Sequence, residues 1–315
     1  MEDAFLNLFP KMYRDKWSAL AGQVPWIQEI RLRRDKPVII HKMDGEWYLG
    51  RQGLTKRQSQ AYCMEEQELN RYVNHFCQDS IYAFQEEIKH GYITVPGGHR
   101  IGLAGQVILD NGIVSGMKNI TFLNIRLAHQ IKGAADVVMP YMYQDGRVLN
   151  TLIISSPGCG KTTLLRDMVR QISDGNSFGE GCTVSVIDER SEIAGCYQGV
   201  PQNDVGIRTD VLDACPKEQG FLMMLRSMSP KVMAVDELGG ESDEGALFKA
   251  ATCGCKVLAT VHGDNVEDIK GKTGWEKIIQ GKLFDRYIVM GCIMGKPTVL
   301  KIYGKDGQEI YACLK

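Results

Sequence analysis

One segment constrains the fold of this 315-residue chain more than any other. An apolar run over Leu149–Ile154 leads into a glycine-rich loop, Ser155–Thr162, and a helical pattern follows over Thr163–Ile172. A buried strand joined to a helix by such a loop is typical of the phosphate-binding loop known as Walker A. The motif normally begins with glycine, whereas this loop begins with Ser155, which can make the turn if its φ is negative. We therefore expect an α/β nucleotide-binding domain.

The residue types in this loop suit a nucleoside triphosphate, and we expect ATP. The glycines let successive backbone N–H groups turn toward phosphate oxygens, and the helix N-terminus adds its dipole. Lys161 supplies a cation for the β- and γ-phosphates, and Thr162 offers its hydroxyl to Mg²⁺. The residues expected to bind the nucleotide are Ser156, Pro157, Gly158, Cys159, Gly160, Lys161, Thr162 and Thr163.

A second motif places two carboxylates, Asp236 and Glu237, directly after the apolar run Val232–Val235. This is the pattern of Walker B. Asp236 would hold Mg²⁺ together with Thr162, usually through water, because Mg²⁺ demands octahedral oxygen ligands and keeps much of its hydration. Glu237 would polarise the attacking water. The two motifs together predict Mg²⁺-dependent hydrolysis of ATP.

Two further strand ends carry polar side chains. The run Thr183–Ile187 precedes Asp188, Glu189 and Arg190. One carboxylate, with Glu189 as the candidate, orients water or Mg²⁺; alternatively, Arg190 pairs with the carboxylates in a structural role. His262 ends a later apolar run, where a histidine can sense the γ-phosphate by hydrogen bonding. The carboxyl ends of strands in such sheets face the ligand, so all these groups are candidate site residues.

The pattern of the chain changes near residue 148. Beyond it, short apolar runs alternate with helical patterns, as in an α/β domain with a mainly parallel sheet. Before it, short strands and turns combine with a helical pattern over residues 64–90, as in a smaller α+β domain. We expect the domains to be residues 1–130 and 131–315. The elements predicted for the second domain are strands Leu149–Ile154, Thr183–Ile187, Val232–Val235 and Val257–Val261 and helices Thr163–Ile172, Lys217–Met228 and Asp243–Ala251.

The composition excludes several classes of protein. Hydrophobic residues make up 44% of the chain and charged residues 24%, which is typical of a globular protein rather than a disordered one. The net charge of -1 gives no support to a nucleic-acid partner, and we expect none. No run approaches the ~18 apolar residues of a spanning helix, and the N-terminus carries charges too early for a signal peptide. We expect a cytoplasmic protein.

Two features leave alternatives open. The ten cysteines include no CxxC pair, so we expect reduced thiols, with redox sensitivity as the alternative. Residues 1–22 carry aromatic and aliphatic side chains at near-helical spacing. Such an amphipathic segment either packs on its own domain or contacts a membrane surface or a partner.

The order of the motifs resembles that of the RecA-like secretion ATPases of type II and type IV systems, which have an aspartate box and a histidine box in these places. Residues 187–239, 29–38, 98–106 and 118–128 are similar to the stage III sporulation protein AA family of endospore-forming bacteria. The resemblance implies a RecA-like ATPase of the mother-cell cytoplasm, peripheral at the membrane. It also implies a homo-oligomer, a hexameric ring by analogy, that powers assembly of or transport through a channel complex with membrane proteins as partners.

Motors of this class complete their site with an arginine from a neighbouring subunit or from the N-terminal domain. The candidates in this chain are Arg100, Arg126, Arg208 and Arg226. Such an arginine stabilises the charge that builds on the transferring phosphoryl group. Two other functions stay open: a nucleic-acid-directed RecA-like ATPase and a nucleotide-gated regulator. Glu237 favours hydrolysis over gating alone.

Overall fold

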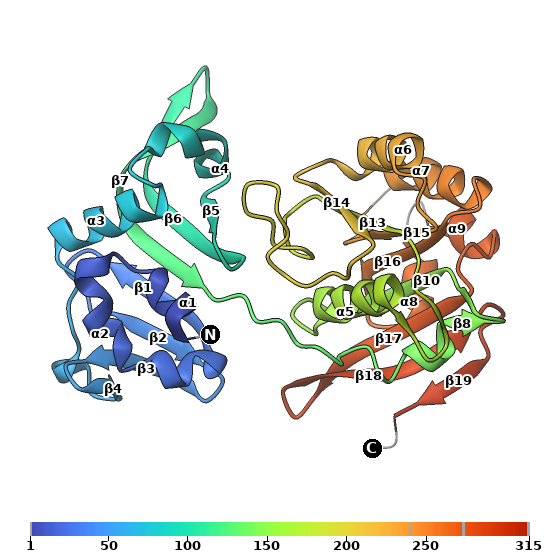
Figure 1. Cartoon of the computed structure of the whole chain (residues 1–315), viewed down its shortest axis with the longest axis horizontal. Coiled ribbons are helices and arrows are strands. Elements are labelled where there is room, and N and C mark those ends of the chain that lie inside the picture. Colours follow the sequence, from blue (N-terminus) through green and yellow to red (C-terminus); the bar gives the residue numbers. More distant parts are fainter. Residues whose placement is uncertain (1, 240, 273–274, 314–315) are drawn as a thin grey trace. The chain divides into compact units, whose positions relative to one another are not determined.

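The structure is a computed structural model that describes residues 2–239, 241–272 and 275–313. It divides into two compact units, Met1–His129 and Gln130–Lys315 (Figure 1). Each unit has its own main sheet and its own hydrophobic core. The phosphate-binding loop belongs to the second unit.

The N-terminal unit is built on an antiparallel seven-stranded sheet in the order β4-β3-β2-β1-β7-β6-β5. Its strands are β1 (Ile27–Arg33), β2 (Ile39–Lys42), β3 (Gly45–Gly50), β4 (Gly53–Thr55), β5 (Tyr92–Val95), β6 (His99–Asp110) and β7 (Ile113–Arg126). Its helices are α1 (Glu2–Asn7), α2 (Arg14–Ser18), α3 (Glu66–Phe76) and α4 (Gln85–Lys89). Alternate residues of β1, such as Ile30 and Leu32, are fully buried, so one face of the sheet covers the core.

The aromatic residues of the first 22 positions lie in the core of their own unit. Phe9 and Trp17 are fully buried, and their rings stack with centroids 4.1 Å apart. The Trp17 indole N–H donates to the Tyr72 hydroxyl over 2.8 Å, so its polar atom has a partner. These side chains therefore pack on their own domain, which is the first of the two interpretations of this segment.

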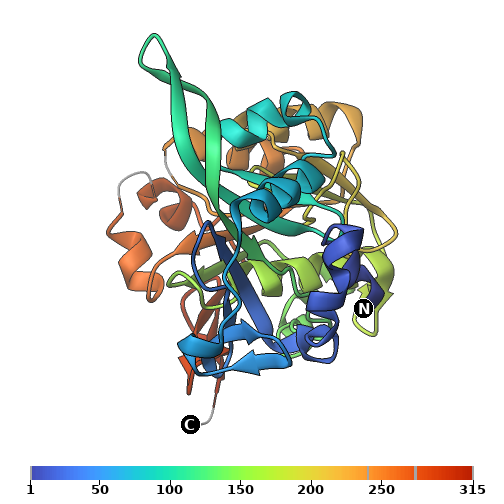
Figure 2. The ribbon, with the colours of Figure 1, turned by 90° about the vertical axis from the view of Figure 1, so that its left-hand side faces the viewer.

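Strands β6 and β7 form a long hairpin whose tip projects from the unit (Figure 2). The sequence pattern predicts separate strands near 103–109, 113–114 and 120–127, but β7 continues through all of residues 113–126. Residues 115–119, of which only Met117 is apolar, lie opposite β6 where most side chains of both strands are exposed. A strand in such a place needs no apolar alternation, which is why its sequence resembles a loop.

The C-terminal unit surrounds an eight-stranded sheet in the order β14-β13-β15-β16-β10-β17-β18-β19. The first six strands in that order run parallel, and β18 and β19 extend the sheet in antiparallel pairs. The strands are β10 (Thr151–Ser155), β13 (Val184–Asp188), β14 (Thr209–Asp213), β15 (Val232–Val235), β16 (Lys256–His262), β17 (Arg286–Ile293), β18 (Lys296–Gly304) and β19 (Glu309–Ala312). The predicted α/β fold with a mainly parallel sheet is confirmed.

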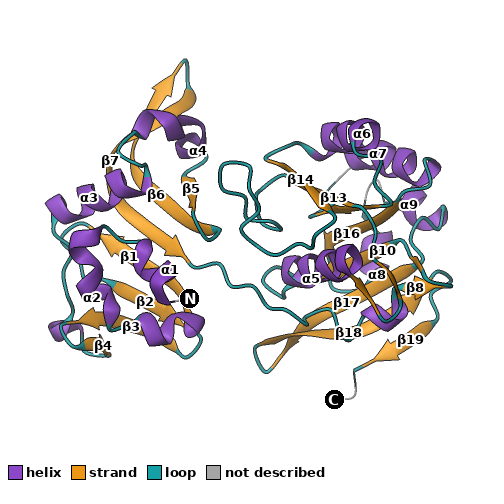
Figure 3. Ribbon diagram, in the orientation of Figure 1, coloured by secondary structure: helices purple, strands orange, loops and turns teal. Residues whose placement is uncertain are grey.

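Helices cover both faces of this sheet (Figure 3). Along β10, Ile153 lies in the core that includes α5, whereas Leu152 and Ile154 lie in the core that includes α6 and α7. The helices are α5 (Lys161–Asp174), α6 (Lys217–Ser227), α7 (Glu241–Thr252), α8 (Val266–Lys270) and α9 (Glu276–Gln280). Two short hairpins complete the unit: β8 (Tyr143–Gln144) with β9 (Arg147–Val148), and β11 (Gly175–Asn176) with β12 (Gly179–Glu180).

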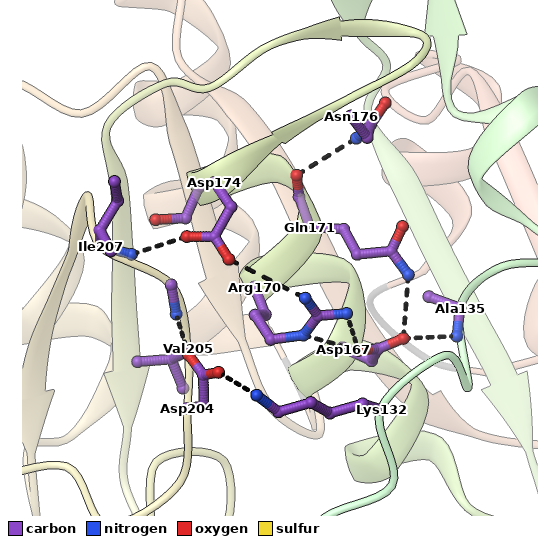
Figure 4. Close-up of polar contacts among 12 residues, drawn as sticks. Lys132, Ala135, Asp167, Arg170, Gln171, Asp174, Asn176, Asp204, Val205 and Ile207 are labelled. Atoms are coloured by element: carbon purple, nitrogen blue, oxygen red, sulfur yellow. Dashed lines mark hydrogen bonds and ion pairs between the residues drawn. The ribbon is translucent and has the colours of Figure 1, made fainter.

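A buried carboxylate fixes α5, the helix that follows the phosphate-binding loop. The side chain of Asp167 accepts hydrogen bonds from the backbone N–H of Ala135 at 2.9 Å, from the guanidinium of Arg170 at 2.7 and 3.0 Å, and from the amide of Gln171 at 3.0 Å (Figure 4). Asp167 is only 2% exposed, and all its donors come from α5 or from the segment before β10. These bonds tie the helix to the chain that precedes it.

The C-terminal end of α5 is held in a similar way by the segment before β14. Asp174 accepts from the backbone N–H of Ile207 at 2.9 Å, and Asp204 forms an ion pair with Lys132 at 2.5 Å (Figure 4). The residues before β10 and before β14 are therefore both linked to this helix or to one another. The position of α5 determines where its first residue, Lys161, lies.

Candidate functional site

The phosphate-binding loop has the backbone that the motif requires. Ser155 ends β10 in extended backbone and is fully buried, so serine at the first position causes no strain. Gly158 and Gly160 have φ of 75° and 83°, which favour glycine. A Cβ on Gly160 would also lie 2.9 Å from the Cβ of Pro297, closer than carbon atoms approach. The two glycines therefore meet local conformational and steric requirements.

Lys161 points from the first turn of α5 toward the ends of the neighbouring strands. Its Nζ donates to the carbonyl of Ser155 at 3.3 Å and to Nδ1 of His262 at 2.9 Å. The side chain is buried, and burial lowers the pKa of Lys161 below its usual value, while the carboxylates of Glu237 and Asp236 act in the opposite direction. A partly desolvated cation at this place interacts strongly with phosphate oxygens.

His262 connects Lys161 to Glu237. The ammonium of Lys161 can only donate, so Nδ1 of His262 accepts, and Nε2 is the protonated nitrogen of the neutral ring. Nε2 lies 2.8 Å from Oε1 of Glu237 and donates to it. The loop lysine, the strand-end histidine and the carboxylate after β15 thus form one hydrogen-bonded chain.

Asp236 contacts both the first turn of α5 and the neighbouring strand β16. Its Oδ2 accepts from the hydroxyl of Thr162 at 3.1 Å, and its Oδ1 accepts from the hydroxyl of Thr260 at 2.6 Å. The hydroxyl oxygen of Thr260 also accepts the backbone N–H of Glu237 at 2.7 Å. Glu237 has a φ of 35°. For a non-glycine residue this backbone conformation costs about 1–3 kcal/mol, and such strain is often found at functional sites.

The donor set of Thr162 and Asp236 fits Mg²⁺. One hydroxyl and one carboxylate, 3.1 Å apart, are oxygen ligands of the kind this ion prefers, and Mg²⁺ completes its octahedron with water and phosphate oxygens. Within the described residues there is no group of three or more His, Cys, Asp or Glu side chains that could hold a metal ion.

Asp188, at the end of β13, stabilises the loop that follows it. Its carboxylate accepts the backbone N–H groups of Glu192, Ile193 and Ala194 at 2.8, 3.0 and 2.8 Å. Burial nevertheless raises the pKa of Asp188 above its usual value. The guanidinium of Arg166 on α5 donates to the carbonyls of the same loop at 2.5 Å, a contact that the sequence analysis did not find.

The two neighbours of Asp188 have different partners. Glu189, predicted as a site residue, forms an ion pair with Lys217 of α6 at 2.6 Å. Arg190 reaches Glu237, with Nη1 3.2 Å from Oε2, and not the carboxylates of its own strand end. Of the predicted carboxylates, the structure brings Asp236 and Glu237 to the loop lysine or the loop threonine.

Two of the four candidate arginines lie toward the amino ends of the parallel strands, whereas the loop lies at their carboxyl ends. Arg208 precedes β14, and its guanidinium donates to the carbonyls of Ser173 and Asp174 at 2.9 and 3.4 Å, at the far end of α5 from Lys161. A helix of 14 residues is about 20 Å long. Arg226 is exposed in the last turn of α6, close to the start of β15. Asp236 follows the end of β15. Within one chain neither side chain is placed to reach Lys161.

The other two candidates belong to the N-terminal unit. The guanidinium of Arg100 lies over the ring of Tyr92 at 3.6 Å. Arg126, which is 60% exposed, forms an ion pair with Glu29, with Nε and Oε1 3.4 Å apart. Both are on neighbouring strands of the antiparallel sheet, directly opposite one another in the pairing of β6 with β7.

An apolar cavity of 380 Å³ lies beside the loop, on the side away from Asp236. Gly160 and Thr163 form one wall, and Met290, Pro297 and Tyr311 come from β17, β18 and β19. A larger hollow of 880 Å³ lies in the N-terminal unit between α3, α4 and the β6–β7 hairpin, but it contains none of the site residues above. The smaller cavity could not be predicted from the sequence, because its apolar wall comes from strands that are distant from the loop along the chain.

Loop residues also contact two side chains that sequence reasoning missed. The hydroxyl of Ser156 donates to Asp264 at 2.6 Å, and the thiol of Cys159 accepts a hydrogen bond from Cys292 at 3.2 Å. Asp264 follows the predicted histidine by two residues, so it has a local signal. Cys292 is 133 positions from its partner and has none.

Comparison with known structures defines the class of fold. The chain is similar to the ATPase DotB of Legionella pneumophila, with a TM-score of 0.58 and 14% sequence identity, covering 94% of this chain and 80% of that one. It is also similar to the pilus retraction motor PilT, solved with bound ADP, with a TM-score of 0.56 and 13% identity over 84% of this chain and 74% of that one. The C-terminal unit therefore has the RecA-like fold of the secretion ATPases, preceded by an N-terminal domain.

Within that class, the chain belongs to the family "Sporulation stage III, protein AA", whose model matches residues 13–310. It is 43% identical over 306 residues to "Stage III sporulation protein AA" of Bacillus subtilis (strain 168), which is 96% of this chain and 95% of that relative. The family resemblance stated from the sequence is confirmed. In the described part of the chain, helices long and apolar enough to cross a membrane are absent.

Proposed function

We propose that this protein hydrolyses ATP with Mg²⁺ as a subunit of a homo-oligomeric ring. The observation that carries the proposal is the chain of hydrogen bonds from Lys161 through His262 to Glu237, beside Thr162 and Asp236. This group combines a cation for phosphates, oxygen ligands for Mg²⁺ and a carboxylate that can accept a proton from water. A site used only to gate a conformational change has no need of the last element.

Each residue has a defined task in this proposal. Lys161 and the N–H groups of the loop bind the β- and γ-phosphates, while Thr162 and Asp236 hold Mg²⁺, directly or through water. When bound, Mg²⁺ neutralises charge on the phosphate oxygens. Glu237 accepts the proton of the attacking water, and Thr260 fixes the strained backbone that aims its carboxylate. His262 links phosphate binding at the lysine to the orientation of Glu237.

The apolar cavity beside Gly160 and Thr163 is proposed to take the adenine base. A purine ring system is flat and apolar on its faces, and the cavity offers Met290, Pro297 and Tyr311 as contacts. Its place supports this assignment, because it adjoins the loop on the side opposite Asp236. Van der Waals contact would then supply much of the binding energy, with few groups able to read the base edge.

Family membership supports the cellular part of the proposal. By the resemblance, the ring is a hexamer in the mother-cell cytoplasm, peripheral at the membrane, and its partners are membrane proteins of a channel complex made during endospore formation. It would power assembly of that complex or transport through it. A nucleic-acid partner is not proposed, because the net charge of the chain is -1.

The test is phosphate release by purified protein, with light scattering in the presence and absence of ATP and Mg²⁺. The Lys161→Ala variant is expected to lose hydrolysis and to bind nucleotide more weakly, because the main cation facing the phosphates is gone. The matched control is Lys270→Ala, which removes an exposed lysine that pairs with Glu267 on α8. Phosphate release by Lys161→Ala at the rate of the control would rule out this loop as the site.

A further inference from the structure

A pair of thiols joins the phosphate-binding loop to the β17–β18 hairpin. Cys292 of β17 donates a hydrogen bond to Cys159 of the loop, with the two sulfur atoms 3.2 Å apart. Cys292 pairs with Pro297 across the hairpin, and Pro297 Cβ lies 2.9 Å from the position of a Cβ on Gly160. The hairpin therefore approaches the loop at two neighbouring residues.

We propose that Cys159 and Cys292 form a reversible disulfide that weakens nucleotide binding, which makes the loop a thiol-responsive switch. The inference rests on the proposed function only in its second part, since the disulfide itself needs no nucleotide. The oxidant is a low-molecular-weight disulfide of the glutathione type.

The exchange balances in two steps. Cys292 is exposed, so its thiolate attacks one sulfur of the small disulfide and releases one small thiol. Cys159, which is buried beside it, then attacks the Cys292 sulfur of the mixed disulfide and releases the second small thiol. The protein loses two protons and two electrons, and the small disulfide gains both. A small thiol in excess reverses the two steps.

The bond would displace the loop backbone. A disulfide places its sulfur atoms about 2.0 Å apart, so the two side chains have to approach by about 1 Å. Cys159 lies between Gly158 and Gly160, whose left-handed backbone is the adaptable part of the loop. A shift of this size moves the N–H groups that would face the phosphates, and charge-assisted hydrogen bonds depend strongly on such geometry. Met290 and Pro297 of the adenine cavity lie on the same hairpin.

The experiment incubates the whole protein with oxidised glutathione and maps disulfides by mass spectrometry of proteolytic fragments. We expect a fragment containing Cys159 joined to one containing Cys292, and slower joining when ATP and Mg²⁺ are present. Binding of a fluorescent ATP analogue should weaken by at least about tenfold on oxidation, if no more than about one loop in ten stays competent to bind. Dithiothreitol should restore binding.

Two variants separate the outcomes. Cys292→Ser should bind the analogue as the reduced wild type does and should keep this affinity after oxidation. Cys253→Ser removes another exposed thiol of the same unit and should remain as sensitive as the wild type. Absence of the cross-linked fragment, or a cross-link that leaves the affinity unchanged, would overturn the inference. Failure of the reduced wild type to bind any nucleotide would instead overturn the proposed function.

Discussion

At the residue scale, two glutamates compete for the role of catalytic base, and their contacts distinguish them. Glu237 accepts from His262 and has a strained backbone beside Asp236, whereas Glu189 is paired with Lys217. Strain and connection to the loop lysine both favour Glu237. In the sequence the two residues occupy equivalent positions, each directly after an aspartate, and in the folded chain their contacts separate them.

The Glu237→Gln variant is expected to bind ATP but to hydrolyse it about 10²–10⁴-fold more slowly, because the amide keeps the acceptor for His262 and cannot take a proton. Glu189→Gln is the matched control and should retain turnover near that of the wild type. Single-turnover phosphate release together with binding of a fluorescent ATP analogue measures both quantities. If Glu189→Gln loses as much turnover as Glu237→Gln, the base has been assigned to the wrong strand.

A second residue-scale prediction concerns pH. Burial, with a smaller effect of nearby His129, lowers the pKa of His99 from 6.5 to about 4, and its Nδ1 accepts the backbone N–H of Ala128. Between these two values the unfolded chain binds more protons than the folded one. The stability of the N-terminal unit should therefore be complete above pH 6.5 and fall as the pH decreases toward 4, by up to about 3 kcal/mol.

Urea unfolding at pH 7.5, 5.5 and 4.5, followed by tryptophan fluorescence, tests this dependence, because three of the four tryptophans belong to the N-terminal unit. The control is His99→Asn, whose amide oxygen can replace the Nδ1 acceptor and does not titrate. Its stability should change less with pH over this range. Equal slopes for the two proteins would show that His99 does not carry the effect.

At the element scale, α5 is held by its buried carboxylate, and we predict that Asp167→Asn lowers the free energy of unfolding of the C-terminal unit by about 2–3 kcal/mol. The asparagine amide would replace one carboxylate oxygen with an NH₂ group. Arg170, Gln171 and the N–H of Ala135 are all donors, so some of them would lose their acceptor. Thermal unfolding followed by circular dichroism measures the loss. Asp145→Asn, at an exposed turn with a φ of 50° that asparagine tolerates, should change the midpoint little.

The same scale shows what the sequence could predict. Strands β10, β13, β15 and β16 are continuous apolar runs, since both faces of a parallel sheet are buried, and all four were predicted. The edge strand β14, Thr209–Asp213, is only partly buried and has too few apolar residues to be distinguished from a loop. Strands β17 to β19 follow the last predicted strand along the chain and were not predicted. Their place in the sheet depends on the pairing of β17 with β10, a strand distant in the sequence.

The same difference between local patterns and long-range contacts applies to the residues of the candidate site. The proximity of Lys161, Asp236 and His262 could be predicted, because each adjoins a local pattern that the fold brings to the carboxyl ends of the parallel strands. Contacts between distant segments could not be predicted, such as Arg190 with Glu237 or Cys159 with Cys292. They depend on how loops pack across the sheet edge, which no local spacing records.

At the scale of the whole molecule, we consider the arginine that would face the transferring phosphoryl group; Arg190 lies beside Glu237 but is paired with that carboxylate. Arg208 and Arg226 lie toward the amino ends of the parallel strands, and Arg100 and Arg126 belong to the other unit. We therefore predict that at least one of the four acts across a domain or subunit boundary. Its alanine variant should lose turnover by about 10³-fold or more and keep ATP binding, because the arginine contacts charge that develops only in the transition state.

Co-expression of that variant with Lys161→Ala tests the arrangement. A subunit with the arginine replaced still has an intact loop, and a Lys161→Ala neighbour still supplies the arginine. In a ring of randomly mixed subunits, about one quarter of the interfaces combine the two intact parts, so activity should return to at most about that fraction of the wild type. Mixing Lys161→Ala with Glu237→Gln should restore nothing, since both remove groups from the same subunit's site. If all four alanine variants hydrolyse ATP normally, or if turnover per subunit stays constant on dilution to monomer, the site is complete within one chain.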